Sequence, residues 1–189
     1  RADGSASNIV WPARSFNTDD HSHAFCPCFA QRVLPMLAKS LLISFLNYNY
    51  EANEQILRRV GELSADEQRC AVDVSHGNVF DLVRHMADTE WSWRRIARGE
   101  KAQQFLWEVE SVADIGALRR FLAEEQTRAI AYVESLSEDE LDRDVELGSS
   151  QEGQPSHARV WQILLHLLNH STHHRAELSR RLAELKRPV

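Results

Sequence analysis

Apolar residues recur every three or four positions through four long stretches of the chain, and this period constrains the fold more than any other feature. In the first stretch they are Leu37, Leu41, Phe45, Tyr48, Ala52, Ile56, Val60 and Leu63. The others span residues 79–98, 115–136 and 160–185. A period near 3.6 is typical of an α-helix that buries one face. Turn-forming residues are scarce, with 7 Gly and 5 Pro among 189 residues,. We therefore predict an all-α fold, a four-helix bundle.

The ends of the second stretch carry capping signals. Asn78 is expected to cap its N-terminus, Asp81 follows three residues later, and Gly99 is expected to end the helix,. The connection from residue 99 to residue 113 is long. The second and third helices therefore need not be antiparallel neighbours.

A faint internal repeat relates the two halves of the chain. Residues 60–67 resemble residues 133–140, and each copy contains a Ser-x-x-Glu capping box, which predicts a short helical turn,. A brief alternation of apolar and polar residues follows each copy, near Val72 and near Val145. The repeat suggests a bundle with pseudo-twofold symmetry; the alternative is that capping boxes and leucines recur by chance.

Residues 1–35 show no sustained period of 2 or 3.6,. They also lack the basic, apolar and small-residue order of an export signal. We predict that this segment is an irregular N-terminal extension and that the bundle domain spans residues 36–189, starting at Met36.

The charge and cysteine content exclude several classes of partner. With 22 Lys+Arg against 28 Asp+Glu the net charge is −6, which argues against nucleic acid as a partner,. No apolar run approaches the roughly 18 residues of a membrane span, so no membrane partner is expected. Three cysteines form no disulfide framework in a chain of this size,. A reducing, cytoplasmic setting is the simpler expectation.

Four histidines lie within nine residues of the fourth stretch: His166, His170, His173 and His174. Because a helix turns about 100° per residue, His170 lies about 40° from His174 around the axis, and His166 and His173 about 80° and 100°. His174 falls where the buried leucine pattern skips a position, between Leu167 and Leu178. His170 and His174 are therefore the pair nearest the buried face.

His85 points inward from the second stretch, because it shares a helix face with Leu82, Thr89 and Ile96,. Three converging buried imidazoles find few hydrogen-bond partners among leucines. A divalent cation resolves this by accepting one lone pair from each ring. Three neutral ligands leave an open coordination position, as in a catalytic site. The alternative is that His85 is a hydrogen-bonded core histidine. No protein residue is predicted to be catalytic; the reacting group would be metal-bound water or thiolate.

Two further residues are candidates for contacting the ligands without binding the metal. His166 lies at the edge of the same helix face. Glu177 lies about 60° from His174, near enough to accept a hydrogen bond from a ligand. The alternative for Glu177 is a solvated surface carboxylate.

Three strings of residues resemble the DinB/YfiT-like family of bundle proteins. They are YNYEANEQIL at 48–57, LVRHMADTEW at 82–91 and NHSTHHRAEL at 169–178. The resemblance covers about residues 36–186, in the right order and spacing. It implies an up-down-down-up bundle with a long crossover between the second and third helices. It also implies a three-histidine metal site, which by position consists of His85, His170 and His174.

The chain departs from the family pattern at three positions. Glu51 stands where the family often has Trp, and Ala176 and Glu177 stand where Gly and Gln are usual. None of these is a ligand position, but all three could alter the wall of the pocket.

The family resemblance implies a metal-dependent enzyme, because characterised relatives include transferases and isomerases that use low-molecular-weight thiols. We expect a thiol-dependent S-transferase or a related isomerase that acts on a small-molecule substrate, and a homodimer as the assembly. The alternatives are a metal-dependent hydrolase, a non-catalytic metal-binding stress-response protein and a bundle that only mediates dimerisation. Histidine sites accept several divalent ions, so zinc or nickel is expected first, with iron or manganese as alternatives.

Overall fold

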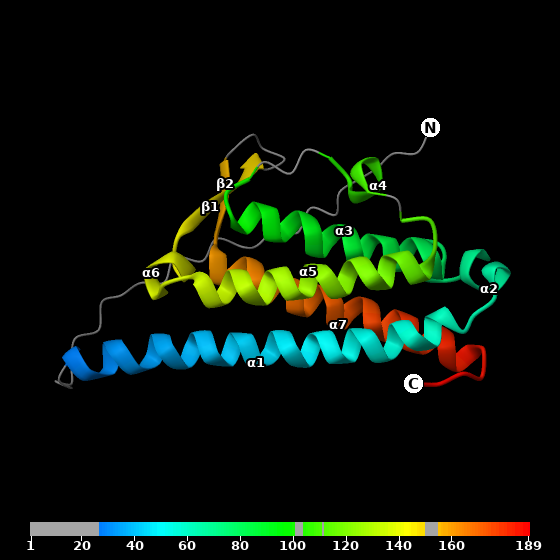
Figure 1. The fold of residues 1–189 in the computed structure, drawn as a ribbon, viewed down its shortest axis with the longest axis horizontal. Helices are drawn as coiled ribbons and strands as arrows, with labels where there is room; N and C mark the ends of the chain where they lie inside the picture. Colours follow the sequence, from blue (N-terminus) through cyan, green and yellow to red (C-terminus); the bar gives the residue numbers. More distant parts are fainter. Residues whose placement is uncertain (1–26, 101–103, 111, 150–154) are drawn as a thin grey trace.

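The computed structural model describes residues 27–100, 104–110, 112–149 and 155–189 (Figure 1). Four long helices dominate it: α1 (Pro27–Gly61), α3 (Val79–Ala97), α5 (Ile115–Ser135) and α7 (Val160–Glu184). The shorter described elements are α2 (Ala65–Arg69), α4 (Leu106–Val109), α6 (Glu138–Leu141), β1 (Asp144–Ser149) and β2 (Pro155–Arg159). Within these ranges, no helix is both long and apolar enough to cross a membrane.

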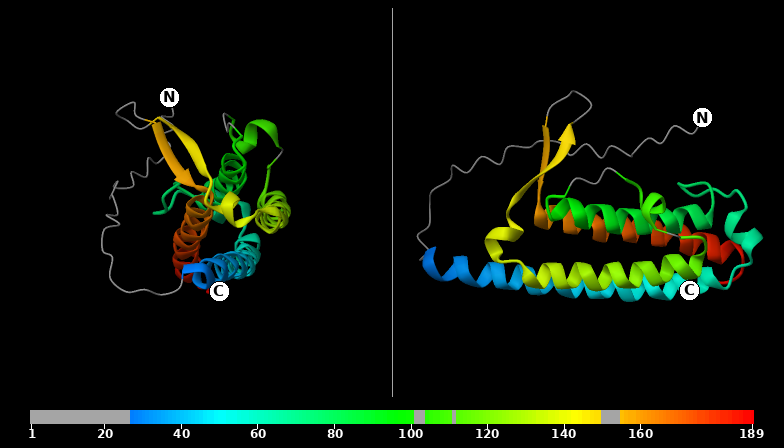
Figure 2. Two further views of the ribbon diagram at one scale, coloured as in Figure 1. Left: turned by 90° about the vertical axis from the view of Figure 1, so that its left-hand side faces the viewer. Right: turned by 45° about the horizontal axis from the view of Figure 1, so that its top comes forward.

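The four long helices lie side by side and enclose a common interior. Helices α1 and α3 each pack against both α5 and α7, and the end-on view in Figure 2 shows the four helices around one axis. In Figure 1, α1 and α7 run from left to right, whereas α3 and α5 run from right to left. The prediction of a predominantly helical chain is confirmed.

The predicted ends of the second helix are confirmed. Asn78 Oδ1 accepts a hydrogen bond from the backbone N–H of Asp81 at 2.8 Å, and Asn78 is the N-cap of α3. Gly99, just beyond the C-terminus of α3, has a φ of +83°, a left-handed conformation that favours glycine,. A side-chain cap at the N-terminus and a left-handed glycine beyond the C-terminus therefore set the length of α3.

The first helix begins earlier than the sequence predicted. Helix α1 starts at Pro27, so residues 27–35 are helical, where we expected an irregular extension. Proline is tolerated at the first position of a helix, because its missing N–H has no partner there in any case. The eight residues that follow Pro27 contain no glycine. Residues 1–26 lie outside the described part of the chain, and the domain start at Met36 stays a prediction.

A small β-hairpin corrects the prediction of an all-α chain. Strands β1 and β2 pair antiparallel, with an irregularity in register between Glu146 and Gly148. The predicted alternation near Val145 forms β1, since Val145 is only 5% exposed and packs in the core while a second strand pairs with its backbone. The matching stretch near Val72 forms a turn instead, in which the Val72 N–H donates to the Gly77 carbonyl.

Both predicted capping boxes form. Ser64 and Glu67 exchange side-chain and backbone hydrogen bonds at the start of α2, and Ser137 and Glu140 do so at the start of α6. Each short helix follows a long one, as the repeat predicted.

The connection between α3 and α5 contains α4, which packs against α3. Its helix α4 buries Leu106 completely in the core, and the Leu106 N–H donates to Asp88 Oδ1 at 2.6 Å. The chain thereby returns to the end at which α3 began, so α5 runs in the same direction as α3 (Figure 1).

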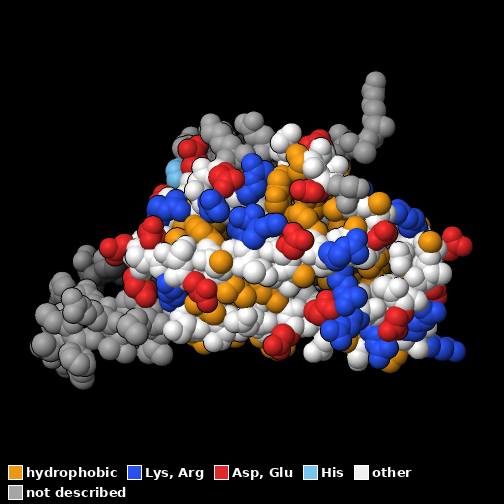
Figure 3. Space-filling model, in the orientation of Figure 1, with side chains coloured by type: hydrophobic (Ala, Val, Ile, Leu, Met, Phe, Trp, Pro, Cys, Tyr) orange, Lys and Arg blue, Asp and Glu red, His pale blue; other side chains and the backbone are white. Residues whose placement is uncertain are grey.

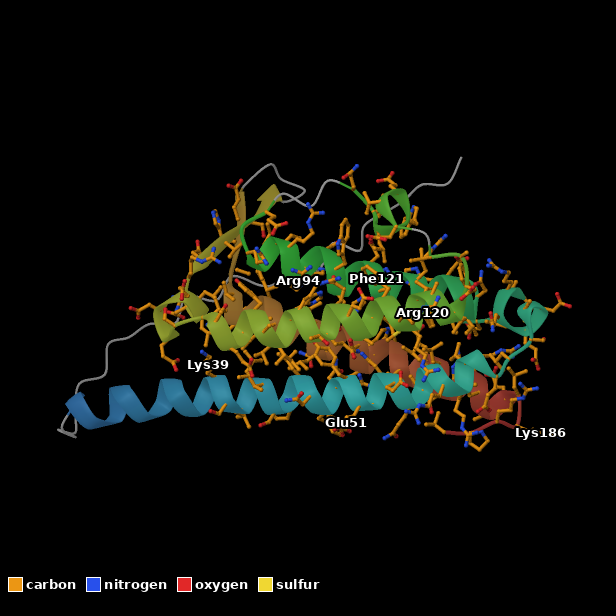
Figure 4. The ribbon with its side chains drawn as sticks, viewed as in Figure 1. Lys39, Glu51, Arg94, Arg120, Phe121 and Lys186 are labelled. Carbon is orange, nitrogen blue, oxygen red and sulfur yellow. The ribbon has the colours of Figure 1, made fainter. Side chains whose placement is uncertain are left out.

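A buried polar network crosses the bundle interior. Arg94 Nε of α3 donates to Glu125 Oε2 of α5 at 2.7 Å, and Figure 4 shows Arg94 between these two helices. Glu125, which is 2% exposed, also binds Arg128. Nearby, Ser171 Oγ of α7 donates to Glu90 Oε1 of α3 at 3.1 Å. Specific polar contacts therefore join α3 to α5 and to α7 within the core.

Helix α1 makes its own polar contacts with its neighbours. Arg175 of α7 donates to Asn53 Oδ1 at 2.8 Å. Lys39 Nζ donates to the Glu134 carbonyl at 2.7 Å, at the C-terminal end of α5 (Figure 4). A cation is favoured there, because the last carbonyls of a helix carry partial negative charge.

Glu90 makes the stability of the protein depend on pH. The pKa of this carboxyl is raised from 4.5 to about 7, because burial and the nearby Glu125 raise it by more than the hydrogen bond from Ser171 lowers it. The folded state thus keeps a proton that the unfolded state releases near pH 4.5, so stability falls as pH rises from about 4.5 to 7. We expect Glu90→Gln, which stays neutral, to stabilise the protein at pH 8 by at most about 3 kcal/mol.

Urea unfolding of the wild type and Glu90→Gln at pH 5 and pH 8 measures this effect. The gain should be small at pH 5 and larger at pH 8, whereas Glu51→Gln, at an exposed position on α1, should show no such difference. An equal effect of Glu90→Gln at both pH values would contradict the assignment of the buried proton.

Candidate metal centre

The structure brings together the three histidines that the sequence predicted as ligands. His170 Nε2 lies 2.9 Å from His85 Nε2 and 3.1 Å from His174 Nε2. His85 comes from α3 and the other two from α7, one helical turn apart. Three imidazole nitrogens therefore converge from two helices that are distant in the sequence. His174 is buried, at 4% exposure.

Glu177 holds the ring of His174 in one orientation. Its Oε2 lies 2.7 Å from His174 Nδ1, and its Oε1 and Oε2 accept from the backbone N–H and the hydroxyl of Ser75 at 2.8 and 2.9 Å. A carboxylate on Nδ1 favours the tautomer that carries its proton there, which leaves the Nε2 lone pair free to face the other rings. Glu177 is thus a partner of a candidate ligand and not a solvated surface group.

Electrostatics keep the converging imidazoles neutral. Burial, assisted by the neighbouring histidines, lowers the pKa of His85 to about 3 and that of His170 to about 2. Burial also lowers the pKa of His174, although Glu177 opposes the shift. Burial raises the pKa of Glu177, but hydrogen bonds from His174 and Ser75 outweigh it and hold that pKa below its usual value. Neutral rings offer lone pairs at pH 7, which metal ligation requires.

The residues present fit a divalent metal ion. Neighbouring ligands around an ion with metal–nitrogen bonds of about 2.1 Å lie about 3.0 Å apart at right angles and about 3.4 Å apart at the tetrahedral angle. The separations of 2.9 and 3.1 Å from His170 Nε2 to the other two Nε2 atoms are close to the right-angle spacing. Each neutral imidazole carries only one proton, so few hydrogen bonds can form between nitrogens this close. A cation that accepts the lone pairs suits this arrangement better.

The other two clustered histidines lie beside the convergence point. The ring of His166 is 4.7 Å from Trp93 and 5.8 Å from the ring of His170, measured between centroids. The side chain of His173 is 69% exposed, and its Nε2 lies 3.8 Å from Glu177 Oε2. Thr89 Oγ1, which the sequence analysis did not select, lies 3.5 Å from His170 Nε2.

A fourth histidine reaches the same place from a loop, and the sequence analysis missed it. The ring of His76 stacks on that of His85, with centroids 3.8 Å apart and planes at 24°. One nitrogen from each of His76, His85 and His174 lies within 4.8 Å of the others. His76 lies outside the periodic segments, so no helix phase could have revealed its position. Its closeness to the predicted cap Asn78 was the one available signal.

Fold and site together define the class: a helical-bundle protein that gathers histidines from two helices at one point. A model of the DinB family matches residues 36–185. The chain therefore belongs to the DinB family.

One solved structure supports the fold independently. It is the crystal structure of a DinB-like protein, YjoA, from Bacillus subtilis, which is 15% identical to this chain. The match covers 77% of this chain and 92% of that one, with a TM-score of 0.56. No curated protein matches the chain. At this identity the likeness concerns the fold alone.

Proposed function

We propose that the protein is a metal-dependent enzyme whose divalent ion is held by His85, His170 and His174. The observation that carries the proposal is the position of His170 Nε2, which lies about 3 Å from both His85 Nε2 and His174 Nε2. Membership in the DinB family and the directions of the four long helices, those of an up-down-down-up bundle, agree with it. Zinc or nickel is the ion that we propose first, with iron and manganese as alternatives.

We propose that the reaction is the transfer of a low-molecular-weight thiol to a small electrophile, or a related isomerisation. A divalent ion on three neutral nitrogens keeps its full charge and lowers the pKa of a bound thiol or water. In a transfer, a sulfur–carbon bond forms as the bond to the leaving group breaks, and the thiol proton passes to solvent. His85, His170 and His174 hold the centre, and Glu177 fixes the ring of His174 through Nδ1.

Turnover with a defined thiol tests the proposed reaction. Protein reconstituted with zinc or nickel is mixed with glutathione or another small thiol and 1-chloro-2,4-dinitrobenzene, and thioether formation is followed. Turnover that needs the metal and the thiol, and that His170→Ala lacks, supports the proposal. Hydrolysis of an activated ester without thiol would favour a metal-dependent hydrolase. Metal uptake without either activity would favour a non-catalytic metal-binding protein.

Chelation is expected to lower the melting temperature. A bound ion joins α3 to α7, and at free metal about a hundredfold above its dissociation constant it adds about 2.7 kcal/mol to the free energy of unfolding. Thermal unfolding with and without EDTA measures the difference. His170→Ala should be insensitive to EDTA, and an unchanged wild-type melting temperature would contradict the proposal.

We also propose a homodimer in the cytoplasm, without a nucleic-acid or membrane partner. The exposed apolar side chains of Leu41, Phe45 and Tyr48 follow one side of α1 and support a contact between copies. On the face shown in Figure 3, acidic and basic side chains are intermixed, which gives no support to a phosphate-binding surface there,.

A further inference from the structure

The segment before α3 is shaped so that His76 stays beside the candidate ligands. The Gly77 N–H donates to the Val74 carbonyl at 3.0 Å, and the Val72 N–H donates to the Gly77 carbonyl at 2.9 Å. Gly77 has a φ of +77°, which glycine adopts without strain and other residues rarely do,. These bonds close a compact turn in which His76 directly precedes the glycine.

Two side chains of α7 fasten this turn to the bundle. Glu177 accepts from the backbone N–H and hydroxyl of Ser75, and Arg180 donates to the Asp73 carbonyl. Glu177 also contacts Nδ1 of His174. One carboxylate therefore fixes a candidate ligand and the loop that carries His76.

The ring of His76 faces the candidate ligands and not the leucine core. It stacks on His85 at 3.8 Å and meets His174 edge-on at 5.7 Å, between centroids. Among the residues that the structure describes, none hydrogen-bonds the His76 ring. Opposite ligands of an ion with metal–nitrogen bonds of about 2.1 Å lie about 4.2 Å apart. One nitrogen of His76 lies within 4.8 Å of a nitrogen of His85 and of His174, so a small movement of the loop would bring it to ligating distance.

We infer that His76 is a fourth ligand of the metal centre and binds the ion from the loop side in the resting protein. The inference rests on the proposed function, because it needs an ion on His85, His170 and His174. It adds a ligand from outside the helices, and it makes the turn at residues 72–77 part of the centre. A zinc ion with four histidines has no open tetrahedral position. A substrate would therefore displace His76 from zinc or bind an ion that accepts more ligands.

Cobalt(II) alone is the probe, because its visible absorption reports the number and geometry of its ligands. Wild type and His76→Ala are titrated with Co²⁺ against a competing chelator, and X-ray absorption counts the imidazole nitrogens around cobalt. We expect four imidazoles in the wild type and three in His76→Ala, with a changed visible spectrum and an affinity lower by about tenfold or more. His157→Ala, an exposed histidine of β2, is the matched control and should behave as wild type.

The two hypotheses fail in different ways. Wild-type protein that takes up no cobalt overturns both the proposed function and this inference. Cobalt bound with the same spectrum and nitrogen count in wild type and His76→Ala overturns the fourth ligand alone, whatever the change in affinity. Melting of the metal-free forms shows whether the variant is folded, and His76→Gln, which keeps the bulk of the side chain, replaces it if it is not.

Discussion

Replacing His170 by alanine is expected to leave the protein unable to retain a divalent metal ion. His170 Nε2 is the atom that lies close to both other candidate ligands, 2.9 Å from His85 Nε2 and 3.1 Å from His174 Nε2. Without it, the two other helical ligands lose the imidazole nitrogen that lies about 3 Å from each of them. Metal stoichiometry after dialysis against a weak chelator measures the loss, which we also expect for His85→Ala and His174→Ala.

Two histidines of the same cluster serve as matched controls. The ring of His166 lies beside Trp93, and the side chain of His173 is largely exposed. Alanine at either position should lower metal affinity by at most the 10- to 100-fold that is typical of residues next to ligands. An empty His166→Ala protein beside a loaded His174→Ala protein would show that the ligand pair on α7 is wrong by one helical turn.

Removing Glu125 is expected to cost more stability than any other single change considered for the polar network. Arg94 has a side chain that is 10% exposed, and Glu125→Leu leaves its guanidinium buried without its carboxylate partner. Breaking one side of a buried ion pair typically costs about 3–5 kcal/mol. Urea unfolding measures the loss.

The double variant Glu125→Leu with Arg94→Met tests the reason for that loss. It should recover most of the lost stability, because replacing a buried pair with apolar side chains is often close to neutral. Glu62→Ala, which breaks the exposed pair with Arg59, should cost about 1 kcal/mol or less,. A double variant as unstable as Glu125→Leu would show that the lost stability is not due to an unpaired charge on Arg94.

The parts of the structure that follow helix phase could be predicted from the sequence, except on α1, where Leu41, Phe45 and Tyr48 of the predicted buried face are exposed. The start of α3 follows from its capping residue, and the starts of α5 and α7 follow from apolar period. The meeting of His85 with His170 and His174 follows from which face of each helix is buried. The helix angle also placed Glu177 near the ligands. It could not show whether the Glu177 carboxylate contacts His174 or faces solvent, because its orientation depends on hydrogen bonds from the loop at Ser75.

The parts that depend on contacts between distant segments could not be predicted. His76 reaches the site through a turn whose shape depends on Gly77 and on tethers from α7. The hairpin could not be predicted from the alternation near Val145 alone, because it also depends on the strand that pairs with it, β2. Glu125 lies among the buried apolar residues of α5, an unusual place for a carboxylate that the sequence does reveal. Its partner could not be identified from the sequence, because Arg94 lies on another helix.

The positions of the candidate ligands along the chain also determine when, during synthesis of the protein, the metal centre can form. His85, in α3, leaves the ribosome long before His170 and His174, which lie in α7. Domains of nascent chains fold from the N-terminal side, but here the interior of α1, α3 and α5 stays uncovered until α7 is released. The three helical candidate ligands therefore cannot meet before α7 has been synthesised, and a chain truncated before α7 would expose an apolar groove while lacking two of them.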